Sequence, residues 1–86
     1  MGRIVVEFYG LARQRAGFAE LAVGAGTVRG ALDAVLAACP DLQVVRDDGV
    51  APEYLLSLNG VRFTKDLDAV LADGDALLIL GADAGG

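Results

Sequence analysis

One segment of the chain has the periodicity of a full-length helix, and it constrains the fold more than any other feature. Thr27 is a residue type preferred at helix N-caps. The apolar residues after it share one face at helical spacing: Val28, Leu32, Val35, Leu36 and Cys39. Pro40 cannot continue a helix, so the helix must end there. An amphipathic helix has one apolar face to bury, and the rest of the chain must supply the surface that covers it.

Segments with strand character flank this helix on both sides. Residues 3–9 and 18–23 precede it and are rich in alternating or β-branched apolar side chains. After the helix, residues 53–58 and 61–63 surround Asn59-Gly60, a dipeptide favoured in two-residue hairpin turns because both positions need a positive φ. The last such segment, residues 76–80, is an uninterrupted apolar run, which is typical of a central strand.

Three segments connect these elements. Residues 11–17 predict one helical turn that stops at Gly17. Gly24-Ala25-Gly26 is expected to end the second strand. Residues 41–52 predict a loop that contains a turn at Asp47-Asp48-Gly49, and residues 41–46 could form a short helix.

The order of hairpin, helix, short hairpin and final strand predicts an α+β fold. One main helix packs across a mixed sheet of four or five strands, and the final strand lies centrally and parallel to the first. This is the β-grasp, or ubiquitin-like, arrangement. The 86 residues suffice for one small domain. We expect that domain at residues 1–80 and a flexible C-terminal tail at residues 81–86.

Composition narrows the function classes. The chain is 55% apolar and carries a net charge of −5, so it lacks the basic surface of a nucleic-acid binder. Residues 1–29 hold four basic and two acidic residues, whereas residues 30–86 hold three basic and ten acidic ones. The acidic half indicates either a basic protein partner or solubility alone. No run of apolar residues is long enough to span a membrane, and charges near Met1 argue against a signal peptide.

The inventory of reactive side chains argues against catalysis. There is no His, which is the commonest general base and metal ligand. The single Cys39 cannot form an internal disulfide, which fits a reducing, cytoplasmic setting, and its place on the helix stripe predicts a buried, inert thiol. Asp73 and Asp75 flank Gly74, where turn formation explains them better than metal binding. The chain has no catalytic constellation and binds no cofactor by itself, so we expect a carrier or substrate.

The segment after the last strand carries the most functional information. It reads Gly81-Ala82-Asp83-Ala84 and then Gly85-Gly86. Glycine has no Cβ, so a Gly-Gly terminus can thread a channel too narrow for other residues. A terminal carboxylate is a poor electrophile, and an enzyme must activate it, for example as an acyl-adenylate, before sulfur or an amine can attack. A short glycine-rich end on a stable domain suits such activation, because the domain can supply the affinity and the end can supply the reach.

Several segments together resemble the MoaD/ThiS family of ubiquitin-like sulfur carriers, over essentially the whole length. The similar stretches are residues 6–13 in the first strand and residues 26–42 around the helix. The others are Leu58-Asn59-Gly60 at the hairpin, residues 71–77 before the last strand, and Gly85-Gly86. Among these carriers the chain looks most similar to the small subunit of molybdopterin synthase.

The resemblance implies a carrier cycle. A ubiquitin-activating-type enzyme adenylates the terminal glycine, here Gly86, with ATP, and a sulfurtransferase converts it to a thiocarboxylate. The resemblance thus implies that Gly86 is the covalent attachment point. It also implies that the tail threads a partner enzyme's active site, where the carrier donates sulfur, through Gly81, Ala82, Asp83, Ala84 and Gly85. In molybdopterin synthase the partner is the large catalytic subunit of a heterotetramer, and the acceptor is a pterin precursor in molybdenum cofactor biosynthesis.

The tail departs from the molybdopterin type, which commonly carries prolines and a Ser before Gly-Gly. This chain has no proline there, and Asp83 adds a charge. The acceptor therefore stays open: carriers for cysteine or thiamine synthesis, and modifiers conjugated to lysines, are alternatives, as is an adaptor with an inert tail. Phe63 and Arg13 are candidates for partner docking, although core packing and a solvated turn would also explain them.

Overall fold

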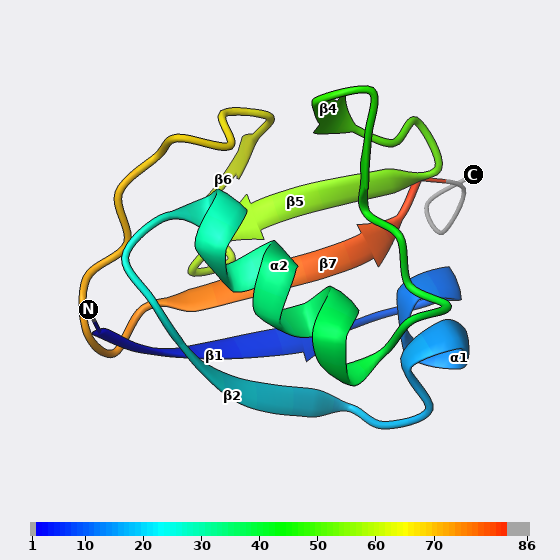
Figure 1. The fold of residues 1–86 in the computed structure, drawn as a ribbon, viewed down its shortest axis with the longest axis horizontal. Coiled ribbons are helices and arrows are strands. Elements are labelled where there is room, and N and C mark those ends of the chain that lie inside the picture. The colour runs from blue at the N-terminus through cyan, green and yellow to red at the C-terminus, as the bar shows by residue number, and fades with distance from the viewer. Residues whose placement is uncertain (1, 83–86) are drawn as a thin grey trace.

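A computed structural model describes residues 2–82. A five-stranded sheet forms its centre, with the strand order β2-β1-β7-β5-β6 (Figure 1). The strands of this sheet are β1 (Gly2–Phe8), β2 (Glu20–Ala25), β5 (Tyr54–Leu58), β6 (Arg62–Thr64) and β7 (Ala76–Gly81). Two helices, α1 (Leu11–Ala16) and α2 (Val28–Ala38), and a small hairpin of β3 (Val45–Arg46) and β4 (Gly49–Val50) complete the described chain.

The topology confirms the expected β-grasp arrangement. Strand β7 lies between β1 and β5 in the middle of the sheet and runs parallel to β1, with Val6 beside Leu77 and Phe8 beside Ile79. Its pairing with β5 is antiparallel. Helix α2 crosses one face of the sheet in Figure 1. The sheet is therefore mixed and has one main helix on one face, as the sequence predicts.

The core forms between that face of the sheet and α2. Val28, Leu32 and Val35 of the helix are buried, which matches the predicted apolar stripe, whereas Leu36 is 43% exposed. The strands contribute side chains at alternate positions: Ile4, Val6, Phe8, Tyr54, Leu56, Leu77 and Ile79. The N-cap is also confirmed, since the Thr27 hydroxyl accepts a hydrogen bond of 3.1 Å from the Gly30 amide.

Two further turn predictions are confirmed. The Asn59-Gly60 turn has φ angles of 55° and 69°, as a two-residue hairpin of this kind requires. Gly17 ends α1 in the left-handed conformation with φ 84°. Both positions are thus set by local sequence chemistry.

Two connections differ from the sequence predictions. The second strand runs from Glu20 to Ala25 and does not stop at Gly24, because its backbone pairs with β1 as far as Gly2 opposite Ala25. Residues 41–46 contain no helix: Val45 and Arg46 pair with β4 across a turn at Asp47-Asp48. Both aspartates adopt a positive φ, 53° and 59°, which closes the hairpin in two residues.

The boundary of the expected C-terminal tail is also corrected. Gly81 is the last residue of β7, pairs with Tyr54, and is buried, so it does not belong to the tail. A Cβ at this position would lie 3.1 Å from both the amide nitrogen and the Cβ of Leu11. Glycine is therefore needed where the N-terminus of α1 packs on the end of β7.

This close approach predicts a stability effect. Gly81→Ala should lower the free energy of unfolding by about 1–3 kcal/mol, because the added methyl group must displace α1. Gly26→Ala is the matched control: a Cβ there meets nothing within 4 Å, and we expect a change below about 0.5 kcal/mol. Urea denaturation followed by circular dichroism measures both. Equal effects of the two substitutions would contradict the packing argument.

Candidate functional site

The candidate site consists of the end of β7 and the sheet face that α2 leaves uncovered. Residues that pair directly across strands share a face of the sheet. Leu80 lies opposite Leu55, and Ser57 lies between Leu78 and Phe63. Leu55, Leu78 and Leu80 alternate with buried apolar residues along their strands, and this face of the sheet points away from α2. We call Leu55, Phe63, Leu78 and Leu80 the apolar sheet face.

Phe63 is the most accessible member of the apolar sheet face. Its side chain is 68% exposed, whereas Leu55, Leu78 and Leu80 are half-buried. Towards β1 the same side of the sheet becomes polar, since the Tyr9 hydroxyl donates a hydrogen bond of 2.5 Å to the Glu7 carboxylate. That hydrogen bond raises the pKa of Tyr9, so the phenol stays protonated. An apolar centre with a polar rim is the usual anatomy of a protein-binding surface.

The end of β7 is fixed to β5 by a hydrogen-bonded network. The Ala82 amide donates to the Glu53 carbonyl oxygen at 2.8 Å, which extends the pairing of β7 with β5 by one step. The Glu53 carboxylate forms ion pairs with Arg46 and, at 3.9 Å, with Arg15. Arg15 also donates a hydrogen bond of 2.7 Å to the hydroxyl of buried Tyr54. We call Arg15, Arg46, Glu53 and Tyr54 the exit network.

The two arginines on α1 differ in their contacts. Arg15 belongs to the exit network, because its guanidinium donates a hydrogen bond to the Tyr54 hydroxyl and lies 5.9 Å from the centre of that ring. Arg13, the docking candidate from the sequence, is exposed on the same helix, and no ion pair of Arg13 is found among residues 2–82. In Figure 1, α1 lies at the end of the sheet where β7 finishes. Arg13 is thus accessible near the point where the chain leaves the domain.

The structure separates the two docking candidates. Phe63 lies on β6, at one edge of the sheet, while Arg13 lies on α1, which follows β1 and packs at the end of β7. Of the residues expected to thread a partner's active site, Gly81 is part of β7 and Ala82 is bonded to Glu53. Asp83, Ala84, Gly85 and Gly86, the expected attachment point, lie outside the described residues.

The apolar sheet face as a whole was not predicted from the sequence. The available signal was the run Ala76–Leu80, in which apolar residues occupy both faces of the strand. That run fits a strand covered on both sides as well as a strand with an open apolar face. Only the sheet order shows that Leu78 and Leu80 join Leu55 and Phe63 on the side without a helix.

Asp73 and Asp75 act as turn residues, as expected. The Asp73 carboxylate accepts a hydrogen bond of 2.7 Å from the Arg3 amide. The Asp75 carboxylate accepts from the Ala72 amide at 2.8 Å and from the Asn59 side chain at 3.3 Å. Their oxygens therefore hold the loop before β7 against the start of β1 and the β5–β6 hairpin.

The chain is similar along nearly its whole length to several solved structures. Small archaeal modifier protein 1 from Haloferax volcanii is 28% identical, with a TM-score of 0.83 over 99% of this chain and 100% of that one. A chain of the Amycolatopsis orientalis BexX/CysO complex is 25% identical, with a TM-score of 0.79 over 96% and 99%. A putative molybdopterin converting factor subunit 1 from Pyrococcus furiosus is 21% identical, with a TM-score of 0.77 over 94% and 98%, and shows the shared fold.

No protein-family model and no curated protein matches the sequence. The structural similarity defines the class of the protein: it has the β-grasp fold of ubiquitin-like proteins. Its structural neighbours are MoaD/ThiS-like sulfur carriers and modifiers, which confirms the resemblance seen in the sequence. Among residues 2–82, no helix is both long and apolar enough to cross a membrane.

Cys39 is the C-cap residue of α2, on the side of the sheet opposite the apolar sheet face, and is 5% exposed. Burial raises the pKa of the Cys39 thiol, so less of the reactive thiolate is present near neutral pH. We expect alkylation of the native protein by iodoacetamide at pH 8 to be at least about tenfold slower than alkylation of the urea-unfolded chain. Mass spectrometry over time measures both rates. Equal rates would mean that Cys39 is accessible and could accept sulfur.

Proposed function

We propose that this chain is a protein-based sulfur carrier whose Gly86 carboxylate, as the C-terminus of the mature chain, is adenylated and converted to a thiocarboxylate. The observation that carries the proposal is the position of β7. This strand contributes Leu78 and Leu80 to the apolar sheet face and leads directly, through Gly81 and Ala82, towards Gly85-Gly86. A partner that docks on the face therefore meets the strand from which the reactive end departs.

The exit network supports the same function. The Ala82 amide is hydrogen-bonded to the Glu53 carbonyl oxygen. The position from which residues 83–86 depart is therefore fixed relative to the apolar sheet face. Four residues extend over at most about 14 Å, which sets the depth at which a partner's active site can lie. The domain would supply the affinity for the partner, and residues 83–86 would carry the terminal carboxylate into the partner's active site.

The proposed partners are three classes of enzyme. A ubiquitin-activating-type enzyme would supply ATP and form the acyl-adenylate, and a sulfurtransferase would supply the sulfur. The acceptor enzyme would be the large catalytic subunit of molybdopterin synthase, in a heterotetramer, acting on a pterin precursor. The structural likeness to a putative molybdopterin converting factor subunit 1 is consistent with this acceptor. Likeness to a chain of the BexX/CysO complex supports docking on a partner enzyme in general.

A second function is conjugation of Gly86 to lysines of other proteins. The observation that favours it is the 28% identity to small archaeal modifier protein 1 over essentially both chains. The two functions share the adenylation step. They differ in the nucleophile that then attacks the activated carbonyl, which is sulfur in a carrier and an amine in a modifier.

The attachment point can be tested directly. The intact mass of the protein first establishes whether the mature chain ends at Gly86. The full chain is then incubated with ATP, the host's activating enzyme and a sulfur donor, and its C-terminal peptide is sequenced by mass spectrometry. Sulfur in place of one Gly86 carboxyl oxygen is the expected result, and isolating the peptide separates it from oxidation at Met1 or Cys39.

A chain that lacks Gly85-Gly86 is the control and should acquire no sulfur. An isopeptide on lysine, without a thiocarboxylate, would support the modifier and contradict the carrier. An unmodified Gly86, with the cognate enzyme shown to be active, would contradict both functions.

Docking on the apolar sheet face predicts a separate effect on binding to the activating enzyme. Phe63→Ala should change the free energy of unfolding by less than about 0.5 kcal/mol, because the ring is mostly exposed. It should raise the Kd for the activating enzyme at least about tenfold, as for other exposed aromatic anchors. Val70→Ala, at a side chain 80% exposed in the loop after β6, is the control and should leave the Kd unchanged. Calorimetric titration measures the Kd of the unchanged protein and of each variant. Equal Kd values for all three would exclude Phe63 from the interface.

A further inference from the structure

The chain contains a single lysine. Six of its seven basic residues are arginines, and the seventh is Lys65. A guanidinium stays protonated in proteins and is not an acyl acceptor, whereas a lysine amine is a nucleophile once it has lost its proton. Any amide that joins a side chain of this protein to an activated carboxyl group must therefore form at Lys65.

Lys65 occupies a distinctive place at the edge of the sheet. It directly follows β6, which pairs with β5 only from Leu56 to Leu58. The Thr64 hydroxyl then accepts a hydrogen bond of 3.0 Å from the Asp66 amide, and this turn takes the chain away from β5. The lysine is exposed, and no ion pair with it occurs within residues 2–82. Its amine is therefore available to a partner.

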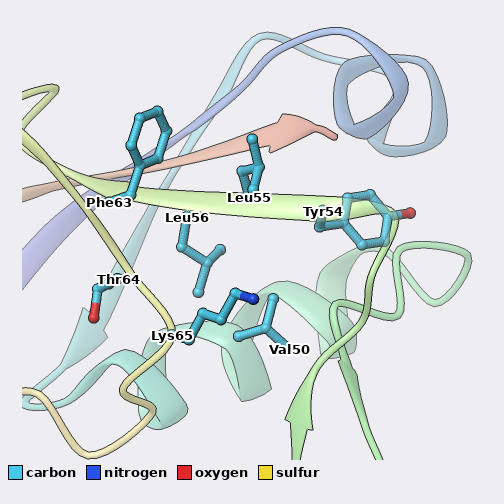
Figure 2. Close-up of a pocket in the computed structure, with 7 residues that line it drawn as sticks. All are labelled: Val50, Tyr54, Leu55, Leu56, Phe63, Thr64 and Lys65. Carbon is cyan, nitrogen blue, oxygen red and sulfur yellow. The ribbon is translucent and has the colours of Figure 1, made fainter. Parts of the chain in front are cut away.

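The departure of the chain from β5 leaves a pocket of about 150 Å³ beside Lys65, which we call the edge pocket. Its walls come from β4, β5 and the end of β6: Val50, Tyr54, Leu55, Leu56, Phe63 and Thr64. Figure 2 shows the Lys65 side chain running towards Val50, with its terminal nitrogen beside the Val50 side chain. Leu55 and Phe63 belong to the apolar sheet face as well, so the pocket adjoins that face.

The end of this same chain has the small side chains that a pocket of this size can admit. Residues 84–86 are Ala-Gly-Gly, and a single methyl group is their only side-chain carbon. Such a segment can approach a small apolar pocket without displacing its walls. To adenylate Gly86, an activating enzyme must enclose the end of the chain that it charges. The copy whose end is enclosed is held by the enzyme, and a second copy can bring its own Lys65 to that end.

We propose that Lys65 is the site at which a second copy of this protein accepts Gly86, so that copies become linked by an isopeptide bond. The inference rests on the proposed activation of Gly86. The neutral Lys65 amine attacks the carbonyl carbon of the Gly86 adenylate. A C–N bond forms, the C–O bond to the phosphate breaks, AMP leaves, and the proton from the nitrogen goes to solvent. No electron transfer occurs, and ATP supplies the driving force through the adenylating enzyme.

The test uses the full chain, ATP and the host's activating enzyme, without a sulfur donor. Expected products are dimers and longer ladders on a denaturing gel, with peptide sequencing that places Gly86 on Lys65. Lys65→Arg should reduce the ladder at least about tenfold. It should leave adenylation unchanged, as followed by ATP–pyrophosphate exchange, because an exposed charge is retained at the same place.

A relocated lysine serves as the matched control for the edge pocket. The double variant Arg62→Lys with Lys65→Arg moves the amine to the other end of β6, where Arg62 lies opposite Leu58. The ladder should not return in this variant, and its full recovery would overturn a role for the pocket.

Three other outcomes would overturn the proposal. These are adenylation without any ladder, linkage at the α-amino group, and closure of one chain on its own Lys65 without dimers. Adenylation that cannot be detected would overturn the proposed function itself, and the exchange assay distinguishes that failure from the others.

Discussion

The position of β7 between β1 and β5 is the constraint on which most of the structure depends. Parallel strands such as β1 and β7 cannot be joined by a tight turn, so the chain between them must form a long crossover. Helix α2 and the β5–β6 hairpin lie within that crossover. Leu77 and Ile79 of β7 are fully buried on the side of the sheet that α2 covers. The strand therefore joins the two halves of the chain in one core.

The same strand determines where the C-terminal segment leaves the domain. Leu78 and Leu80 alternate with the buried residues and lie on the uncovered face, beside Leu55 and near Phe63. Gly81 then lets α1 pack closely on the end of β7, and the Ala82 amide is hydrogen-bonded to Glu53, just before β5. The stability of the core and the position at which the C-terminal segment leaves the domain thus depend on consecutive residues of β7 and on Ala82. A substitution that loosens the end of β7 affects both.

Several carboxylates in the acidic half of the chain, residues 30–86, stabilise the fold itself. Arg29, on the first turn of α2, pairs with Asp48 of the β3–β4 turn at 2.7 Å and with Asp68 at 3.6 Å. Asp73 and Asp75 accept backbone hydrogen bonds, and Glu53 pairs with two arginines in the exit network. Several of these carboxylates therefore hold loops in place, and their charge alone is weak evidence for a basic partner. The accessible apolar side chain of Phe63 is the stronger indication of an interface.

By itself, the sequence determined the local elements of this protein. Thr27, Pro40, Asn59-Gly60 and Gly17 act through backbone chemistry within a few residues, and the fold follows from the order of the elements that they delimit. Tertiary structure decided what depends on contacts between distant segments. The extension of β2 through Gly24 results from pairing with β1, and the inclusion of Gly81 in β7 results from pairing with Tyr54. The apolar sheet face and the edge pocket combine residues from separate strands, so no local pattern could identify them.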